Sequence, residues 1–345
     1  MAFAGLKQPG QIGIREELAD YIAVVDAKST PFTSMIPKGK DIGNMTFSWQ
    51  VDNYSAVVMG GMVEGTDIVM QDATNPVSAR ARFYNYAQVF KRDLRIGFIA
   101  ETSDVAGLPG TELANGIAKR MVEIKRDCEA TFCCTNQLNV IDNATNAYLT
   151  ASLGTWLTLT GAAGQVGLPT TAFAPASGAV TTTVSASITE TTIQAVLTAI
   201  YGATGRIRDY DAIVGTTLKR AFTNLTVGAL TNSNTTNGVA ATSVRTFNMD
   251  IDSTYTSSID IFEGDFGRLI LHPTTFIGGT TGTALNAEAF KGYVIPMELC
   301  EMRYAKLPDV TTLPDAGGGP ARLVRMIAGL VVKNPLGFGM FNGAS

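Results

Sequence analysis

The chain has 345 residues, of which 46% are hydrophobic and only 16% are charged, and its formal net charge is −4. Proteins that read nucleic-acid sequences usually carry a basic excess, so this balance argues against that class. Ordinary globular proteins carry about 25% charged residues. A surface with so few charges must be built largely from Thr, Ser, Asn and Gly, and we expect other subunits to cover part of it.

Neither end of the sequence carries a signal for export or membrane insertion. Residues Met1 to Gln11 lack the apolar core of a signal peptide. The apolar stretch Met326–Val332 is far shorter than the about 18–20 residues that a membrane span needs. We therefore expect a protein that is made in the cytoplasm, has no membrane partner and stays there unless it is packaged.

The cysteines are interpreted as small buried hydrophobes in a reducing compartment. Three of the four, Cys128, Cys133 and Cys134, fall on one predicted helix, and the fourth is Cys300. No pair has the CxxC spacing typical of zinc ligands, so the sequence predicts no zinc site.

The N-terminal forty residues are predicted to form an arm. Apolar residues recur at helical spacing between Ile14 and Val25, and this helix should end before Thr30-Pro31-Phe32, because proline restrains the residue that precedes it. Pro37 and Gly39 favour extended chain afterwards. A helix this short has little core of its own, so we expect it to pack on another surface.

Residues 45–95 are predicted to form a long two-stranded ribbon. Met45–Val51 and Ala79–Phe90 alternate in polarity around a loop rich in Gly and Met. The outgoing half carries the acids Asp52, Glu64, Asp67 and Asp72, and the returning half carries the cations Arg80, Arg82, Lys91, Arg92 and Arg95. Because an isolated ribbon is marginally stable in water, it should lie on a partner surface, within the chain or on another copy.

The strongest helical pattern predicts a helix from Thr111 to about Leu138. Its apolar residues recur every three or four positions, and Thr111 follows a Pro-Gly breaker and can act as the N-cap. At 1.5 Å per residue such a helix is roughly 40 Å long and spans the molecule.

Residues 139–188 contain one charged residue, Asp142, and we expect an inserted loop docked through Trp156. A second helix is predicted over Ser187–Ala203, with a capping box of Ser187 and Glu190 and an end at Gly202 and Gly205. Residues 226–258 are polar and rich in Asn and Thr, and they predict a long loop with edge strands. The other predicted elements are a strand at Asp211–Val214, a helix at Thr216–Leu225, and strands at Ile259–Phe262, Leu269–His272, Met297–Tyr304, Arg322–Leu330 and Val331–Phe341.

The residues that enzymes use in recognisable arrangements are absent. His272 is the one histidine, and GxSxG, GxGxxG and Walker lysine motifs do not occur. Asp265-Phe266-Gly267 spells the magnesium motif of kinases without its supporting motifs, so we interpret it as a tight turn. The sequence therefore predicts neither an enzyme nor a cofactor or metal site.

The order of the parts is an arm, a ribbon, a spanning helix, an α/β lobe and terminal strands. Within them stand Thr30-Pro31-Phe32, Phe47-x-Trp49, Glu64-Gly65, Arg82-x-x-Asn85-x-x-Gln88, Glu123-x-Lys125-Arg126-Asp127-x-Glu129, Asp265-Phe266-Gly267, Ala305-Lys306-Leu307 and Val331-x-x-Asn334. Over nearly the whole chain this pattern resembles the Hong Kong 97-type capsid subunit of tailed bacteriophages. Within that group it is similar to the SU-ten-type branch of major head proteins.

The resemblance implies an α+β fold with six segments. They are an N-terminal arm (1–44), an E-loop (45–95), a P-domain with a spine helix (96–140), an inserted loop or subdomain (141–188), an A-domain (189–296), and a return to the P-domain with a final A-domain strand (297–345). It also implies a structural protein of the virion, whose hexamers and pentamers close into an icosahedral shell around double-stranded DNA.

The functional residues implied are contacts between subunits. The candidates are Arg80, Arg82, Lys91, Arg92, Arg95, Glu64, Asp67 and Phe32. A solvated face of the ribbon is the alternative for its charges. The implied partners are other copies, a portal, and possible scaffold or cement proteins, with DNA contacted weakly and without sequence specificity. About 44 residues precede the ribbon, which is short for a fused scaffolding segment, so we expect a separate scaffold or none.

Two other classes stay open at this point. One is an encapsulin-like compartment shell of the same fold without a viral context. The other is a different phage structural protein, such as a tail-tube subunit, although these are usually shorter and β-rich and lack a spanning helix. Neighbouring genes for a portal, a terminase or an enzyme cargo would separate these classes.

Overall fold

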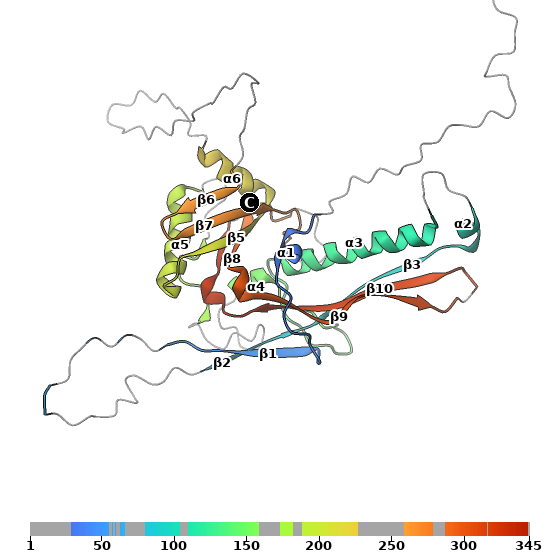
Figure 1. Ribbon diagram of the computed structural model, residues 1–345, viewed down its shortest axis with the longest axis horizontal. Coiled ribbons are helices and arrows are strands. Elements are labelled where there is room, and N and C mark those ends of the chain that lie inside the picture. Colours follow the sequence, from blue (N-terminus) through green and yellow to red (C-terminus); the bar gives the residue numbers. More distant parts are fainter. Residues whose placement is uncertain are drawn as a thin grey trace, which may run out of the picture.

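The computed structural model describes residues 29–54, 57, 59, 63–65, 80–103, 110–158, 173–181, 188–226, 259–278, 287–315 and 317–343. These form an elongated molecule in which a long helix lies along a three-stranded sheet, beside a compact lobe around a six-stranded sheet and a two-stranded ribbon (Figure 1). The helix predicted around Ile14–Val25 and nearly all of the loop predicted at 226–258 lie outside the described residues.

The spanning helix is α3 (Glu112–Phe132), and Thr111 is its N-cap as predicted, with Oγ1 accepting the N–H of Ala114 at 3.3 Å. The helix ends at Phe132, earlier than the predicted Leu138. The Tyr293 hydroxyl bonds to the carbonyl oxygens of Cys133 and Cys134 at 3.1 and 3.3 Å, which holds the end of the helix on the compact lobe. No helix within the described ranges is long and apolar enough to cross a membrane.

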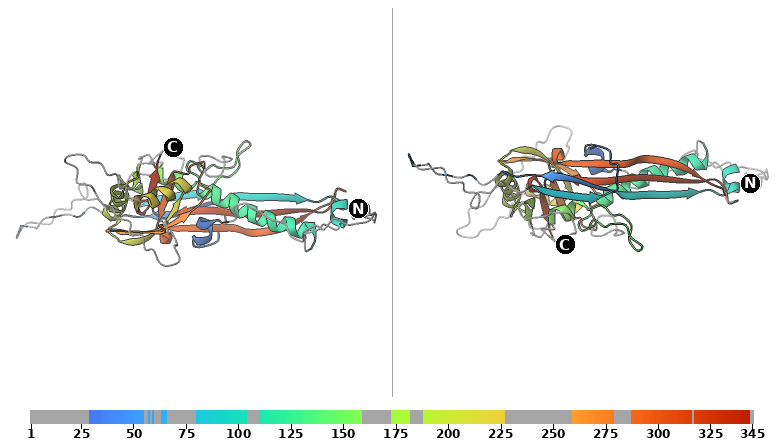
Figure 2. Two further views of the ribbon diagram at one scale, coloured as in Figure 1. Left: turned by 90° about the horizontal axis from the view of Figure 1, so that it is seen from above. Right: turned by 90° about the horizontal axis from the view of Figure 1, so that it is seen from below.

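The three-stranded antiparallel sheet has the order β3 (Gln88–Arg95), β10 (Ala321–Val332), β9 (Cys300–Leu313). Helix α3 covers one of its faces (Figure 2). The short helix α2 (Phe98–Thr102) follows β3. At the other end of the spine, α1 (Pro31–Met35) packs against α3.

The C-terminal strands differ from the prediction at their boundaries. Val331 and Val332 continue β10 and pair with β9, so the predicted strand Val331–Phe341 is wrong in its first half. The chain then turns through η5 (Pro335–Gly337), because the Asn334 side chain accepts the N–H of Leu336 at 3.1 Å and proline starts the turn. Likewise η4 (Met297–Leu299) is a 3₁₀ turn that precedes β9.

The compact lobe contains a six-stranded sheet with the order β4 (Val180–Thr181), β11 (Gly339–Asn342), β8 (Lys291–Ile295), β5 (Arg208–Val214), β7 (Gly267–Pro273), β6 (Ile261–Gly264). Helices α5 (Glu190–Thr204) and α6 (Thr216–Thr226) pack on it. The predicted apolar face of α5 is fully buried: Ile193, Val196, Leu197 and Ile200.

The ends of α5 illustrate a wrong and a correct prediction. The N-cap is Thr189, whose Oγ1 accepts the N–H of Thr192 at 3.3 Å, so the predicted capping box of Ser187 and Glu190 is wrong. Gly202 lies within the helix, and Gly205 ends it with φ of +63°, a conformation that favours glycine.

Asp265-Phe266-Gly267 forms the tight turn between β6 and β7, as predicted. The Phe266 ring stacks on Tyr201 of α5 with ring centroids 4.8 Å apart. Gly267 has φ of +149°, and a Cβ there would lie 2.7 Å from the carbonyl oxygen of Arg208. The motif therefore serves packing at a turn.

The ribbon pairs β1 (Thr46–Val51) with β2 (Ala81–Tyr86) in antiparallel register, from Thr46 opposite Tyr86 to Val51 opposite Ala81. The returning chain leaves β1 at Ala87 and enters the three-stranded sheet as β3. The predicted two-stranded ribbon is therefore shorter than 45–95, and its last eight residues, Gln88–Arg95, pair with β10 instead.

Trp156 on α4 (Leu153–Thr158) is fully buried and joins the predicted inserted segment to the ribbon. Its ring centroid lies 5.6 Å from that of Trp49 on β1 and 5.9 Å from that of Phe83 on β2. The prediction that this segment docks through Trp156 is confirmed by these contacts.

A buried amide network fixes the base of the ribbon. The Asn85 Nδ2 donates to the Leu330 carbonyl at 2.7 Å and the Thr150 hydroxyl at 3.1 Å, and its Oδ1 accepts the N–H of Ala151 at 2.9 Å. Two residues past the ribbon, the Gln88 side chain accepts from Gln137 Nε2 at 2.9 Å. These bonds connect β2, the chain around residue 150 and β10.

Replacing Asn85 by alanine is expected to lower the free energy of unfolding by about 3 kcal/mol, because buried donors and acceptors lose their partners. Urea unfolding of unassembled subunits measures the change. Asn146→Ala, at an exposed asparagine, is the matched control and should shift stability by less than about 0.5 kcal/mol. Equal effects of the two substitutions would contradict this account of the network.

Candidate assembly surfaces

The described residues hold no arrangement typical of a reactive centre. Among them, no group of three or more His, Cys, Asp or Glu side chains could bind a metal ion. The His272 Nε2 lies 3.0 Å from Asp211 Oδ1 on the neighbouring strand β5. All four cysteines are free and buried, as predicted, and burial raises the pKa of the Cys128, Cys133 and Cys300 thiols, which keeps them protonated and unreactive.

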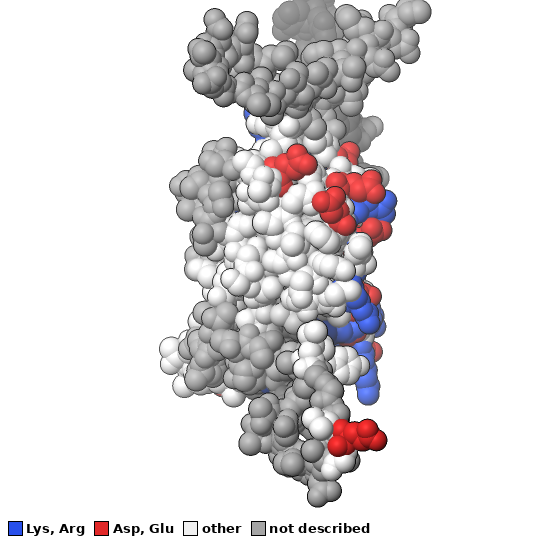
Figure 3. Space-filling view, turned by 90° about the vertical axis from the view of Figure 1, so that its left-hand side faces the viewer, with Lys and Arg blue, Asp and Glu red and all other residues white. Residues whose placement is uncertain are grey.

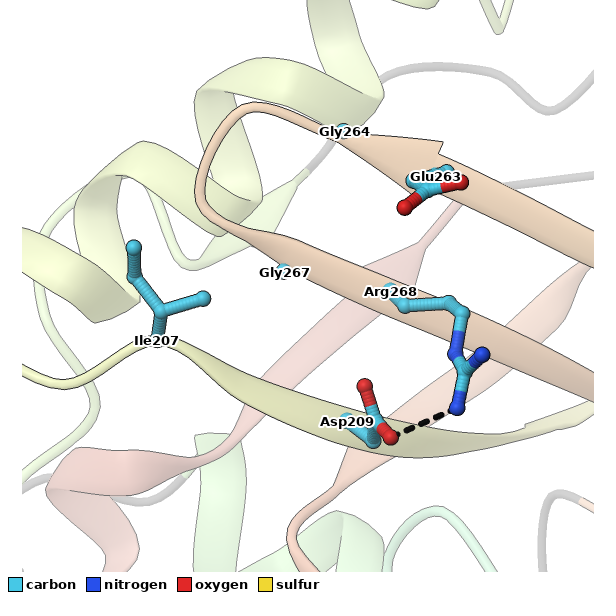
Figure 4. A pocket seen from close by; sticks show the side chains of 6 residues that line it. All are labelled: Ile207, Asp209, Glu263, Gly264, Gly267 and Arg268. Atoms are coloured by element: carbon cyan, nitrogen blue, oxygen red, sulfur yellow. Dashed lines mark hydrogen bonds and ion pairs between the residues drawn. The ribbon is translucent and has the colours of Figure 1, made fainter.

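The end of the molecule that carries the compact lobe shows few charges. In Figure 3 uncharged atoms dominate this end, and the charged side chains gather along one side of it. A small open pocket of about 290 Å³ lies in this lobe, at the turn between β6 and β7 (Figure 4). Arg268 Nη2 lies 2.6 Å from Asp209 Oδ2 at this pocket, and Glu263 is the third charged residue that lines it.

The ribbon cations differ in whether they have partners. Arg80 Nε lies 3.2 Å from Asp52 Oδ2 across the ribbon, and both side chains are largely exposed. Arg82 and Glu64 are exposed, and no ion pair joins either of them to another described residue. Asp67 lies outside the described residues.

Apolar side chains on the chain that extends from β1 are exposed. Tyr54, Val57, Met59 and Val63 are between 74% and 103% exposed. Soluble monomers expose single apolar residues commonly, but a succession on one projecting segment is typical of a contact surface.

The cations of β3 lie on the three-stranded sheet and not on the ribbon. Arg92 donates from Nε and Nη2 to the two oxygens of Asp127 on α3, both at 2.7 Å, and this hydrogen bonding raises the pKa of Arg92. Arg95 lies 3.7 Å from Asp315 in the loop between β9 and β10. Lys91 is exposed and has no ion-pair partner within the described ranges. Arg92 and Arg95 thus have ion-pair partners inside the subunit. The prediction placed both residues on the ribbon and did not indicate these partners.

Phe32, predicted as a contact between subunits, lies inside the subunit. Its side chain is fully buried, and its ring meets Phe132 of α3 edge-on with centroids 6.4 Å apart. The reason is that α1 docks on the end of the spine helix, so its aromatic side chain faces the core.

Glu129 of α3 holds the first turn of α1. Its Oε1 accepts the N–H of Phe32 at 2.9 Å and its Oε2 accepts the N–H of Thr33 at 2.7 Å. Glu129 is fully buried. The first N–H groups of a helix have no partner within the helix, so a carboxylate from another element satisfies them well. Sequence reasoning missed this contact, because Glu129 and Phe32 lie far apart in the chain and no local pattern connects them.

The comparison with family models gives one match: the SU10 major capsid protein, over residues 4–345. The chain belongs to this family. It is therefore a structural protein of the phage head shell. The family match favours this class over a compartment shell or a tail subunit. A comparison with curated proteins finds no match.

Solved phage capsids share the fold. A chain of the cyanophage A-1(L) capsid asymmetric unit is 10% identical with a TM-score of 0.68, covering 95% of this chain and 96% of that chain. A chain from Mycobacterium phage Adephagia is 12% identical with a TM-score of 0.57 and 99% coverage of both. A chain of the native GTA particle capsid is 11% identical with a TM-score of 0.57 and 98% coverage of both. The fold of this capsid protein is thus the Hong Kong 97 type.

The carboxyl of Glu129 is buried, and we expect it to make the stability of this subunit depend on pH. Burial raises its pKa, and the hydrogen bonds from Thr33 and Phe32 offset this only in part. The folded subunit then binds a proton there more tightly than the unfolded chain. The contribution of Glu129 to stability is greatest below about pH 4.5 and is lost as the pH rises through the folded-state pKa.

We therefore predict that the free energy of unfolding of the wild type falls, relative to that of Glu129→Gln, as the pH rises from about 4 to 7. Urea unfolding of both proteins across this range gives the difference directly, because other titrating groups cancel. Parallel pH profiles for the two proteins would show that Glu129 does not titrate in this way.

Proposed function

We propose that copies of this capsid protein form hexamers and pentamers that close into an icosahedral shell, and that the ribbon and its extension lie over a neighbouring copy. The exposed apolar extension carries the proposal. Beyond the end of β1, the described apolar side chains Tyr54, Val57, Met59 and Val63 have little cover from the subunit, and exposed apolar residues close together in the chain are typical of a contact surface.

A second set of exposed apolar residues supports contacts at the opposite end of the molecule. Phe98 and Ile99 of α2 are 71% and 79% exposed. The ribbon of β1 and β2 lies toward the left of the molecule in Figure 1, and α2 lies at its right-hand end. Contacts between different surfaces repeat around a ring when the rotation closes, as hexamers and pentamers require.

The proposed content of the shell is double-stranded DNA, held weakly and without sequence specificity. The net charge of −4 supports this, because a wall with a basic excess would bind the polymer tightly. We further propose that the protein has no catalytic activity, that a portal completes the shell and that assembly takes place in the host cytoplasm. A scaffold or cement protein is compatible with the same subunit.

The contact model first predicts that Arg82→Glu impairs closure of the shell. This side chain is exposed on the ribbon and has no ion-pair partner among the described residues, so charge reversal should leave the melting temperature of the subunit unchanged and block or misdirect shell closure. One exposed pair is worth only about 0–1 kcal/mol, but a shell repeats each contact many times. Electron microscopy beside circular dichroism melting measures both effects.

Arg82→Lys keeps the charge and serves as the matched control, which should assemble normally. Arg80 is less informative, since its reversal would also place a carboxylate against Asp52 of the same ribbon. Normal particles from Arg82→Glu would show that this cation faces solvent in the shell, and its role as a contact would then be abandoned.

The contact model also predicts protection of Met59 on assembly. Its side chain is 93% exposed in the subunit, so peroxide should convert it to the sulfoxide rapidly in unassembled protein and slowly in closed shells. Peptide mass spectrometry gives both rates, and Met340, which is fully buried, is the internal reference. Equal oxidation rates before and after assembly would place the ribbon extension in solvent.

A further inference from the structure

Charged residues concentrate on the spine helix, although the chain as a whole has few of them. Helix α3 carries four acidic and four basic residues among its 21, whereas only 16% of the chain is charged. Spacing alone would allow Lys119 to pair with Glu123, and Lys125 with Glu129, because residues four apart are neighbours on a helix. Neither pair forms. The fourth acid, Glu112, lies in the first turn, where the helix dipole favours it.

The three acids in the second half of the helix are bound by other groups. Glu123 Oε2 lies 2.6 Å from Arg120 Nη1. Asp127 accepts two hydrogen bonds from Arg92 of β3, both at 2.7 Å. Glu129 accepts the amides of the first turn of α1. The carboxylates that could neutralise the two lysines are therefore engaged elsewhere.

Lys119 and Lys125 border a strip of the helix surface that carries no carboxylate. Both lysines are exposed, and no ion pair joins either of them to another described residue. At 3.6 residues per turn, Ala118 and Val122 lie between them around the helix, and both are exposed. We call these four residues the basic face of α3. The small side chains between the lysines allow a large ligand to approach the helix closely.

The basic face and the ribbon lie on opposite sides of the three-stranded sheet. Seen from above, α3 lies in front of the sheet, and seen from below, β1 and β2 do (Figures 1 and 2). Phe90 meets a ring of α3 and Arg92 binds α3, so Lys91 between them lies on the sheet face that points away from the helix. Lys91 is exposed too, and it offers a comparison cation on the other side of the subunit.

The chemistry of this face suits the backbone of double-stranded DNA better than a protein. A duplex is a stiff rod with one negative charge per about 1.7 Å of its axis, and α3 is a straight support roughly 30 Å long. Lysine is a flexible point charge that reaches phosphates without a fixed geometry. A protein partner would need a central apolar anchor, whereas only Ala118 and Val122 lie between the lysines, and Val122 is 37% exposed.

We propose that the basic face of α3 lines the inside of the shell and contacts the phosphates of the packaged double-stranded DNA. The inference rests on the proposed function, since it assumes a closed shell that contains DNA. It adds the surface of the subunit that meets the DNA and the two side chains that hold it. Two cations on each copy make a contact that salt weakens, which agrees with weak, sequence-independent holding by a subunit of net charge −4.

The test compares lysine acetylation in empty and DNA-filled shells of the full chain. A small N-hydroxysuccinimide ester modifies accessible lysines, and peptide mass spectrometry gives the rate at each one. Lys119 and Lys125 should react several-fold more slowly in filled than in empty shells, because phosphates cover them. Lys91 should react at the same rate in both. Formaldehyde treatment of filled shells should give nucleotide adducts on Lys119 and Lys125.

The double variant Lys119→Gln, Lys125→Gln tests whether the basic face is instead a contact between copies. It removes two exposed charges, so the subunit should keep its melting temperature, and its shells should close normally in electron micrographs. Open or irregular shells from this variant would overturn the inference, because they would show that the face meets protein.

Three acetylation results would also overturn it: equal rates at Lys119 and Lys125 in empty and filled shells, slow reaction in both, or protection of Lys91 by DNA in their place. Slow reaction in both would mean that protein covers the face. A wild-type protein that forms no shells, or shells that take up no DNA, would refute the proposed function. Filled shells in which the two lysines react freely would refute this inference alone.

Discussion

The buried amide of Asn85 is the interaction on which the extended parts of this subunit depend. It lies where the ribbon meets the body, and it bonds at once to the chain around residue 150 and to Leu330 of β10. A ribbon that projects from a protein has few contacts of its own, so its direction is set at its base. The aromatic contacts of Trp156 with Trp49 and Phe83 reinforce that base from the other side.

The charges of the subunit divide according to what surrounds them. Next to the spine helix, Arg92 and Asp127 form a two-point pair, and the planar guanidinium suits this geometry. On the ribbon, Arg82 is exposed and has no ion-pair partner among the described residues. The chain has few charged residues, and each one that forms an ion pair inside the subunit leaves fewer for contacts with neighbours. The remaining surface must therefore rely on apolar and neutral polar groups.

Local patterns in the sequence were sufficient for elements whose stability is local. The N-cap and apolar face of α3, the buried face of α5 and the turn at Asp265-Phe266 were all predictable. The errors fall where distant contacts decide. The returning strand changes sheets at Ala87, and Asn85 finds partners 65 and 245 residues away, which no window of sequence contains. Phe32 was expected, from the resemblance, to contact another subunit, but it is buried against α3 residues that come nearly a hundred positions later in the chain.

A capsid subunit needs a rigid core, and the segments that leave the core need a defined direction. Different residues of this chain serve these two requirements. The apolar cluster between α3 and the sheet supplies rigidity without specifying direction. Directed polar contacts stand where an extension leaves the body: Asn85 at the ribbon and Glu129 at α1. Buried polar groups are weak contributors to net stability but discriminate between orientations, since a misplaced partner leaves them unsatisfied. At these two places they fix how β2 and α1 join the body of the subunit.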